Sequence, residues 1–418
     1  MRPPRASRTW QALFLLLFAI LLVALTYGNL GFAEQAPGGN DFLPRWLGTR
    51  LWVTQGVSPY DPSVSQQAQQ IIYGRPADPA SGEDLALFAY PLPITIFVLP
   101  FSVLPFVLAR ALWMTLLEVC LLGLMLLSIR LTRWRPGPLA LGGLMLFSIG
   151  WYHAFRAVVL GQFAVIEAVL IAGALLAIQR ESDAAAGMLL SLSLLKPQIS
   201  VLLVPFVLVW AWSRRRTGLI GWTVGSSVVL FGGFMLLMPN WPLLWLREVV
   251  TYPAYTSAVS ASPLSLLAGI FPAASGWLTA ILSALAGFYL LWEWVLAGGK
   301  HDTWFQWTAS MTLVVTQLVV FRTASTNYLV FMPGILLISG VCLQRWKLAG
   351  RLVVGAIMLF LAVGPWLLFL NTVQGNQESL LMLVPLPLLM FIGLLWVRWW
   401  ATRANVLSIG GGKPLGRL

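Results

Sequence analysis

Apolar residues in this chain come in runs of about 20, the length that an α-helix needs to cross roughly 30 Å of hydrocarbon. Short basic or Gly/Pro-rich segments separate the runs. A segment inside a lipid bilayer must satisfy its backbone hydrogen bonds internally, which makes a helix the expected form of each run. The composition agrees, because 59% of the 418 residues are hydrophobic and only 10% are charged. The sequence therefore predicts an all-α polytopic membrane protein.

Twelve runs are predicted to be membrane-spanning helices. They cover residues 10–30, 106–128, 138–153, 162–178, 186–195, 199–212, 217–238, 275–297, 303–321, 328–343, 352–370 and 380–400. The fifth is short and stops at Lys196-Pro197, which indicates a helix that ends within the membrane. Together they form a single transmembrane domain over residues 1–418, with an external loop at 31–105, core helices at 106–215 and C-terminal helices at 216–418.

The distribution of positive charge predicts the orientation. With the N-terminus inside, the inner segments hold 18 of the 26 Lys and Arg residues, as the positive-inside rule requires. The formal net charge of +12 is thereby explained without a nucleic-acid partner. Residues 91–104 are apolar but short and rich in proline, and a span there would move the basic cluster around Arg130 to the outside. We expect this stretch to be a helix lying on the outer surface.

The first external loop holds six of the fourteen acidic residues. Residues 40–52 have the pattern of an interfacial amphipathic helix, and Asp41 lies where that helix begins. One interpretation of Asp41 is a helix N-cap, since Asp is a favoured capping residue. Asp61, between Tyr60 and Pro62, is expected to form a turn.

Other polar residues follow the outer ends of later runs, on the same predicted face as Asp41. We expect Arg156, Lys196 and Arg322 to bind an anionic phosphate group, and a second set of residues to contact the rest of the bound substrate: Tyr60, His153, Gln162, Gln198 and Asn327. A carboxylate beside cations suits general-base catalysis next to an anionic leaving group. The competing interpretation is that each Lys or Arg reaches toward lipid headgroups and that His153 is only interfacial. A functional role is most strongly indicated for Lys196, because this residue interrupts an apolar run.

An ordered set of short motifs resembles glycosyltransferase family 87, within the GT-C superfamily. The set comprises Asp41-Phe42, Gly56-x-Ser58-Pro59-Tyr60-Asp61, Tyr90-Pro91-x-Pro93, Pro100, Leu104-Pro105, Ala111-x-Trp113, Gly161-Gln162 and Lys196-Pro197. The resemblance covers residues 10–215 by motif and the remainder by hydropathy.

The resemblance implies a GT-C fold with about 12 transmembrane helices and an active site under the large first external loop. It also implies a plasma-membrane enzyme that inverts the sugar's anomeric centre, with Asp41 at the position of the family's base. The implied partners are a polyprenyl-phosphate sugar donor (mannose in the best-known members), a lipid or glycan acceptor and membrane lipids. No cofactor or metal site is expected. Many family members have a histidine near the stretch Ser325-Thr326-Asn327-Tyr328, and this chain has none there.

Other classes of membrane protein remain open at this point. A transporter or flippase would show short loops and internal repeats, whereas this chain has a long first loop and no evident repeat. A ligase or polymerase for lipid-linked glycans would be expected to place its large external loop late in the chain. A non-catalytic scaffold leaves the loop unexplained.

Overall fold

The structure is a computed structural model that describes residues 8–36, 38–81, 83–255, 262–300, 302–320, 323–375 and 378–403. All regular elements in these ranges are helices. The first are α1 (Arg8–Gln35), α2 (Leu43–Gln55), α3 (Pro62–Tyr73), η1 (Pro79–Ser81), η2 (Leu92–Ile94), α4 (Thr95–Ser102), α5 (Phe106–Leu131), α6 (Pro138–Gly150), α7 (Tyr152–Leu160), α8 (Ala164–Gln179), α9 (Asp183–Ser193), α10 (Pro197–Ser200) and α11 (Leu203–Ser213). The others are α12 (Thr217–Leu237), α13 (Trp241–Tyr255), α14 (Pro263–Ala268), η3 (Pro272–Ala274), α15 (Ser275–Ala297), α16 (Asp302–Val319), η4 (Ser325–Phe331), α17 (Met332–Thr372), η5 (Leu380–Leu383) and α18 (Pro385–Ala401). The prediction of an all-α chain is confirmed for the described residues.

Six helical segments of the described chain are long and apolar enough to cross a membrane, and a seventh is reached if α6 and α7, bent by 48°, form one broken span. Other predicted spans correspond to helices shorter than a bilayer requires, such as α8, α9 and α11. The total of twelve stays a prediction. The multi-pass character of the protein is clear from the long apolar helices alone.

The 41 residues of α17 are two helical arms joined by a sharp turn. Lys347 has φ 46° and ψ −110°, which no helix accommodates. Gly350 lies directly against the backbone of Cys342, although eight residues of continuous helix would separate them by about 12 Å. The chain therefore reverses here. The two arms correspond to the predicted runs 328–343 and 352–370.

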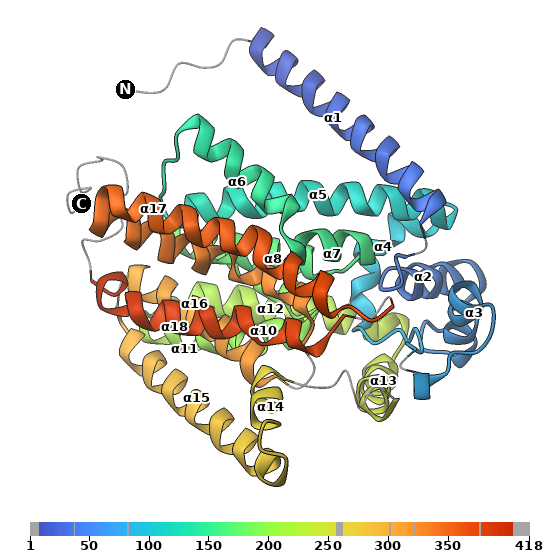
Figure 1. The fold of residues 1–418 in the computed structure, drawn as a ribbon. Coiled ribbons are helices and arrows are strands. Elements are labelled where there is room, and N and C mark those ends of the chain that lie inside the picture. The colour runs from blue at the N-terminus through green and yellow to red at the C-terminus, as the bar shows by residue number, and fades with distance from the viewer. Residues whose placement is uncertain are drawn as a thin grey trace.

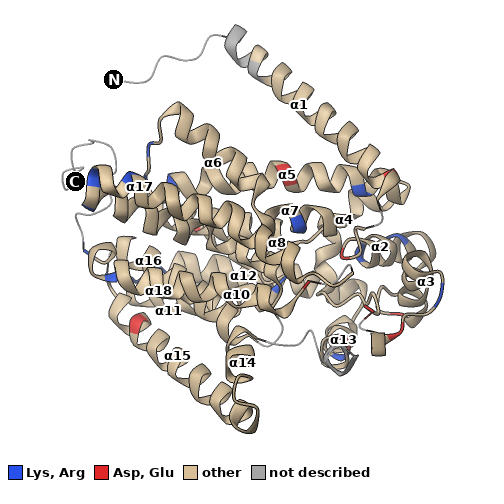
Figure 2. Ribbon diagram, in the orientation of Figure 1, with Lys and Arg blue, Asp and Glu red and all other residues tan. Residues whose placement is uncertain are grey.

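The loop helices α2 and α3 gather with α4 and α13 at one end of the bundle (Figure 1). Lys and Arg positions mark the ends of several bundle helices at the opposite, left-hand end (Figure 2). Residues 91–104 contain only η2 and the eight-residue α4, too short to cross a bilayer. The Trp46 indole donates to the Phe101 carbonyl, and the Arg50 guanidinium donates to the Ser102 carbonyl. This short helix is thus fastened beneath α2, as a surface element would be.

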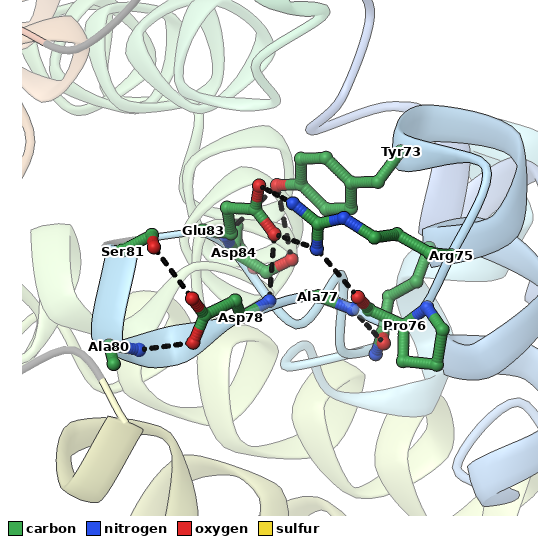
Figure 3. A network of polar contacts seen from close by, with 10 residues as sticks. Tyr73, Arg75, Pro76, Ala77, Asp78, Ala80, Ser81, Glu83 and Asp84 are labelled. Atoms are coloured by element: carbon green, nitrogen blue, oxygen red, sulfur yellow. Dashed lines mark hydrogen bonds and ion pairs between the residues drawn. The ribbon is translucent and has the colours of Figure 1, made fainter.

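The tip of the loop is held by a polar network around Arg75 (Figure 3). Its guanidinium donates to both carboxylate oxygens of Glu83, at 2.8 and 2.7 Å. The Asp78 carboxylate accepts from the backbone N–H of Ala80 and the Ser81 hydroxyl, and these bonds keep the pKa of Asp78 below its usual value. The backbone N–H of Asp84 donates to the Tyr73 hydroxyl. The described residues of the loop tip are therefore tied to one another and to α3.

The carboxylates inside the bundle have different surroundings. Glu118 accepts a hydrogen bond from Asn29 of α1 at 3.0 Å. Glu293 forms a bidentate ion pair with Arg398, at 2.7 and 3.0 Å. Glu167 is fully buried, and neither carboxylate oxygen has a hydrogen-bond partner among the described residues. Two of the three thus hold α1 against α5 and α15 against α18.

Candidate active site

The backbone of Asp41 is docked onto the end of α7. The N–H groups of Gly39 and Asp41 donate to the carbonyls of Val159 and Leu160, each at 3.2 Å. Phe42 is buried and stacks on the Trp113 ring of α5, with ring centroids 4.8 Å apart. These contacts join the external loop to two bundle helices and fix where the Asp41 side chain begins.

Close packing at Gly161 makes this docking possible. Gly161 ends α7 with φ 73°, in the left-handed region that favours glycine. Its carbonyl accepts hydrogen bonds from the Trp113 indole at 3.0 Å and from the Arg45 guanidinium at 3.4 Å. A Cβ at this position would lie 2.6 Å from the Cβ of Phe42. Glycine is therefore required here for both its dihedral angles and its small volume.

Asp41 is not a helix cap in this structure. The N-cap of α2 is Phe42, and no side chain makes a capping hydrogen bond there. Asp61 shows the alternative: its carboxylate accepts from the N–H of Ser63 at 2.9 Å and caps α3. The turn-forming role predicted for Asp61 is confirmed. The carboxylate of Asp41 is thus left available for another role.

A buried polar chain leads from Asp41 to Lys196. The ammonium of Lys196 donates to the amide oxygen of Gln162 at 2.9 Å, and the Gln162 side chain in turn hydrogen-bonds the carboxylate of Asp41. Lys196 is only 2% exposed, which is unusual for lysine. It is there because α9 ends at Ser193 and Pro197 begins α10, so the chain turns at Lys196 itself.

Arg45 is the second cation near Asp41, after Lys196. Its guanidinium lies 4.5 Å from the centre of the Tyr90 ring, and the Lys196 ammonium lies 6.0 Å from the same ring. The Nε of Arg45 is buried with no hydrogen-bond partner among the described residues. The Tyr60 hydroxyl donates to the backbone carbonyl of Tyr90 at 2.7 Å and so ties this residue to the loop. Two cations thus converge beside one carboxylate.

Burial raises the pKa of Asp41 above its ordinary value. The positive charges of Arg45 and Lys196 and the hydrogen bond from Gln162 oppose this effect, and the negative charge of Asp84 adds to it. The side chain is only partly exposed to solvent. A carboxyl group whose pKa lies above its usual range is a better proton acceptor near neutral pH.

Sequence reasoning missed Arg45, Tyr90 and Asp84 as members of this site. Arg45 follows Asp41 by four residues, the spacing of neighbours on one helix face, and that spacing was the available signal. Tyr90 belongs to the Tyr90-Pro91-x-Pro93 motif but offers no charge. The contribution of Asp84 depends on the folding of the loop tip, which no local pattern reveals.

The other predicted site residues lie on α7, η4 and α10. Arg156 forms an ion pair with Glu378 at 3.0 Å, and the Tyr152 hydroxyl donates to the same carboxylate. His153 is buried, with its ring 5.4 Å from that of Tyr328.

Asn327 is also buried, and its amide donates to the Thr323 hydroxyl at 3.4 Å. Gln198 is held through its backbone carbonyl, which accepts from Gln317. Arg322 lies outside the described residues. The structure thus brings Asp41, Gln162 and Lys196 together and gives Arg156 a carboxylate partner. Across the described ranges, no three His, Cys, Asp or Glu residues gather closely enough to hold a metal ion.

Comparison with known proteins identifies the family of this chain. The model of glycosyltransferase family 87 matches residues 88–321, more than half of the sequence. The matched range contains Gln162 and Lys196 and begins after Asp41. No curated protein and no solved structure matches the chain. Together with its long apolar helices, the match shows that this chain is a multi-pass membrane glycosyltransferase and a member of glycosyltransferase family 87, a family of the GT-C type.

Proposed function

We propose that this enzyme transfers a sugar, mannose by resemblance, from a polyprenyl-phosphate donor to a lipid or glycan acceptor, with Asp41 as the general base. The proposal includes the GT-C fold with twelve spans, inversion at the anomeric carbon, and a site on the external face of the plasma membrane. The observation that supports it most directly is that the carboxylate of Asp41 caps no helix and is connected through Gln162 to the buried Lys196.

The chemistry requires a base and a stabilised leaving group. An acceptor hydroxyl forms a bond to the anomeric carbon as the bond from that carbon to the phosphate oxygen breaks. The hydroxyl proton passes to Asp41, and the electron pair of the broken bond stays on the phosphate. Direct displacement of this kind inverts the anomeric centre. A lipid-borne donor also explains how sugar transfer can operate within a bundle of apolar helices.

Lys196 and Arg45 are the cations we assign to the departing phosphate. Both face the Tyr90 ring within 6.0 Å of its centre, and Arg45 has a buried donor without a partner among the described residues. Preorganised donors of this kind stabilise charge that develops in the transition state. Arg156 stands one helical turn before the carbonyls that hold Asp41, and we assign it, together with Arg322, to the donor phosphate as well.

The remaining polar residues are assigned to substrate binding. Gln162 orients Asp41 and Lys196 through its amide. His153 is on α7 and Asn327 is on η4, and these two elements pack against each other. The Nδ1 of His153 and the Oδ1 of Asn327 are buried and have no hydrogen-bond partner among the described residues. Tyr60 and Gln198 complete the group.

The direct test is transfer by the purified protein. It is incubated with polyprenyl-phosphate mannose and a membrane-lipid acceptor extract, and the lipids are then analysed by mass spectrometry. The expected result is a hexose added to one acceptor and release of polyprenyl phosphate. Nucleotide sugars should give no product. Transfer from a nucleotide sugar in the absence of the lipid donor would contradict the proposed donor class.

A further inference from the structure

A pocket lies on the same external loop, and Asp41 is not among the residues that line it. It has a volume of about 540 Å³ and is formed between α3 with its neighbouring segments and Glu248 of α13. The first loop also contacts the segment that leads into α13. The Ser58 hydroxyl lies 3.7 Å from the Met238 sulfur, and the Trp52 ring packs against Phe234. Ligand pockets in proteins are typically about 300–1,000 Å³, so this one is large enough for one or two sugar rings.

The lining of the pocket carries the chemistry of carbohydrate recognition. Its aromatic side is formed by the small exposed parts of Tyr60 and Phe88, which are otherwise buried and whose rings meet edge to face at 5.3 Å. Its polar side includes the side chains of Gln66 and Glu248, which make no hydrogen bond or ion pair with another side chain or with the backbone of the described residues. Aromatic rings can cover the C–H faces of a sugar, while amide and carboxylate groups bind its hydroxyls.

The charge of the lining excludes an anionic ligand. Asp61 and Glu248 both contribute carboxylates, and none of the described lining residues is Lys, Arg or His. A phosphate or uronic acid placed here would face negative charge without a compensating cation. The pocket therefore differs from the Asp41 site, where two cations converge. A neutral, polyhydroxylated ligand fits both the charge and the polarity.

We propose that this pocket binds a neutral sugar unit of the acceptor, at a distance from the hydroxyl that reacts. The inference rests on the proposed function, since it assumes that the acceptor reaches Asp41. Tyr60 links the pocket to the Asp41 site. Tyr60 lines the pocket, and its hydroxyl donates to the backbone carbonyl of Tyr90, whose ring faces Arg45 and Lys196. An acceptor bound in the pocket would extend along this link toward the base.

The test uses a bulky side chain that fills the pocket and a matched neighbour. Gln66 and Gln67 are adjacent, exposed residues of α3, and only Gln66 lines the pocket. Saturation-transfer NMR of the protein without donor is recorded with maltose, cellobiose and mannobiose, and with glucose 6-phosphate. We expect at least one neutral disaccharide to bind wild type and Gln67→Trp, at least tenfold weaker binding to Gln66→Trp, and no signal from glucose 6-phosphate.

Several results would overturn this inference. They are equal disaccharide binding by the two Trp variants, absence of binding by wild type, and binding of the phosphorylated sugar as strongly as the neutral ones. In the transfer assay, Gln66→Trp should raise the acceptor KM at least tenfold and leave the donor KM unchanged. Equal melting temperatures of the two variants establish that both are folded. The NMR experiment measures binding and needs no turnover. Its result can therefore be interpreted even if Asp41 proves not to be the catalytic base.

Discussion

Asp41 has surroundings unlike those of an ordinary surface carboxylate. It is partly buried, hydrogen-bonded to Gln162 and placed between the positive charges of Arg45 and Lys196 and the negative charge of Asp84. A residue used only for capping would hold a backbone N–H, as Asp61 does. The two aspartates therefore form a matched pair for distinguishing catalysis from local structure.

Replacement of Asp41 by asparagine should abolish most of the transfer activity. Asn retains the shape of the side chain but cannot accept a proton, and general-base catalysis typically contributes about 10²–10⁴-fold to the rate. We expect kcat to fall within that range and donor binding to persist. The control Asp61→Asn should leave kcat at saturating acceptor nearly unchanged, because Asn also caps helices well. More than about a tenth of the wild-type rate in Asp41→Asn would rule out the base assignment.

The pH dependence should report the same group. Asp41 acts as a base only when it is ionised, and burial raises its pKa above the ordinary carboxyl value of about 3.9. The rate should therefore fall as the pH is lowered, with a midpoint above that value. The measurement is kcat/KM against pH. Arg45→Gln removes a charge that lowers the pKa, so it should move the midpoint to higher pH. A shift to lower pH would contradict the assignment of that limb to Asp41.

Lys196→Ala should weaken the handling of the donor phosphate. Losing a hydrogen bond to a charged group costs about 1.5–3 kcal/mol, which corresponds to a decrease of roughly 10–150-fold in kcat/KM for the donor. Arg156→Ala should act in the same direction. Arg75→Ala serves as the control, because its ion pair with Glu83 is at the exposed loop tip and such pairs contribute little. Equal kinetics for all three variants would mean that the phosphate is bound elsewhere.

At the scale of elements, the site depends on how the first loop packs against the ends of α7 and α5. Phe42 and Trp113 stack, and Gly161 lies between them and the Arg45 guanidinium. The carboxylate of Asp41 is consequently positioned by bundle helices, and the loop alone would leave it undefined. Packing of this density tolerates little added volume.

Gly161→Ala should separate the loop from the bundle. The new methyl group would stand 2.6 Å from the Phe42 Cβ, at a residue with φ 73°. Strain and overpacking together should destabilise the fold by about 1–3 kcal/mol and lower kcat at least tenfold. Gly56→Ala is the matched control, with φ 70° and open space around it. Thermal unfolding and kcat are compared for both. A similar loss in both variants would attribute the effect to backbone strain alone.

At the scale of the whole molecule, some helices are buried by other helices and some expose most of their residues. Nearly every residue of α8 is buried by other helices, whereas few residues of α12 or α1 are. In α16 the hydroxyls of Thr308, Thr312 and Thr316 are buried and donate to carbonyls one turn earlier. The bundle therefore has a protein-covered centre and an apolar periphery that fits lipid.

The orientation of this bundle can be tested by labelling. The uneven distribution of basic residues predicts that both termini are cytoplasmic and the first loop external. A Gln67→Cys variant places a thiol on an exposed face of α3, whereas Cys120 and Cys342 are at least partly buried within helices. An impermeant maleimide should label Gln67→Cys in intact cells. Labelling that occurs only after permeabilisation would reverse the topology.

The sequence by itself determined the class of this protein and its chemistry at the level of the family. Runs of about 20 apolar residues indicate membrane-spanning helices, because the hydropathy of a segment can be read without knowing its partners. It also indicated which residues to examine, through Asp41 at the start of a loop helix and Lys196 in an apolar run. It indicated that the helix before Lys196, α9, is short. It did not show that α8 and α11 are also shorter than a bilayer requires, because burial by protein and burial by lipid select the same residue types.

Only the tertiary structure decided which candidates share a site. Asp41 lies 121 residues before Gln162 and 155 before Lys196 in the sequence. The three residues meet because α7 and α9 end, and α8 begins, on the same side of the bundle. The pairing of Arg156 with Glu378 and the approach of Arg45 to Tyr90 are likewise long-range contacts. Local patterns fix helices and turns, but such contacts follow from packing over the whole chain, which no single segment encodes.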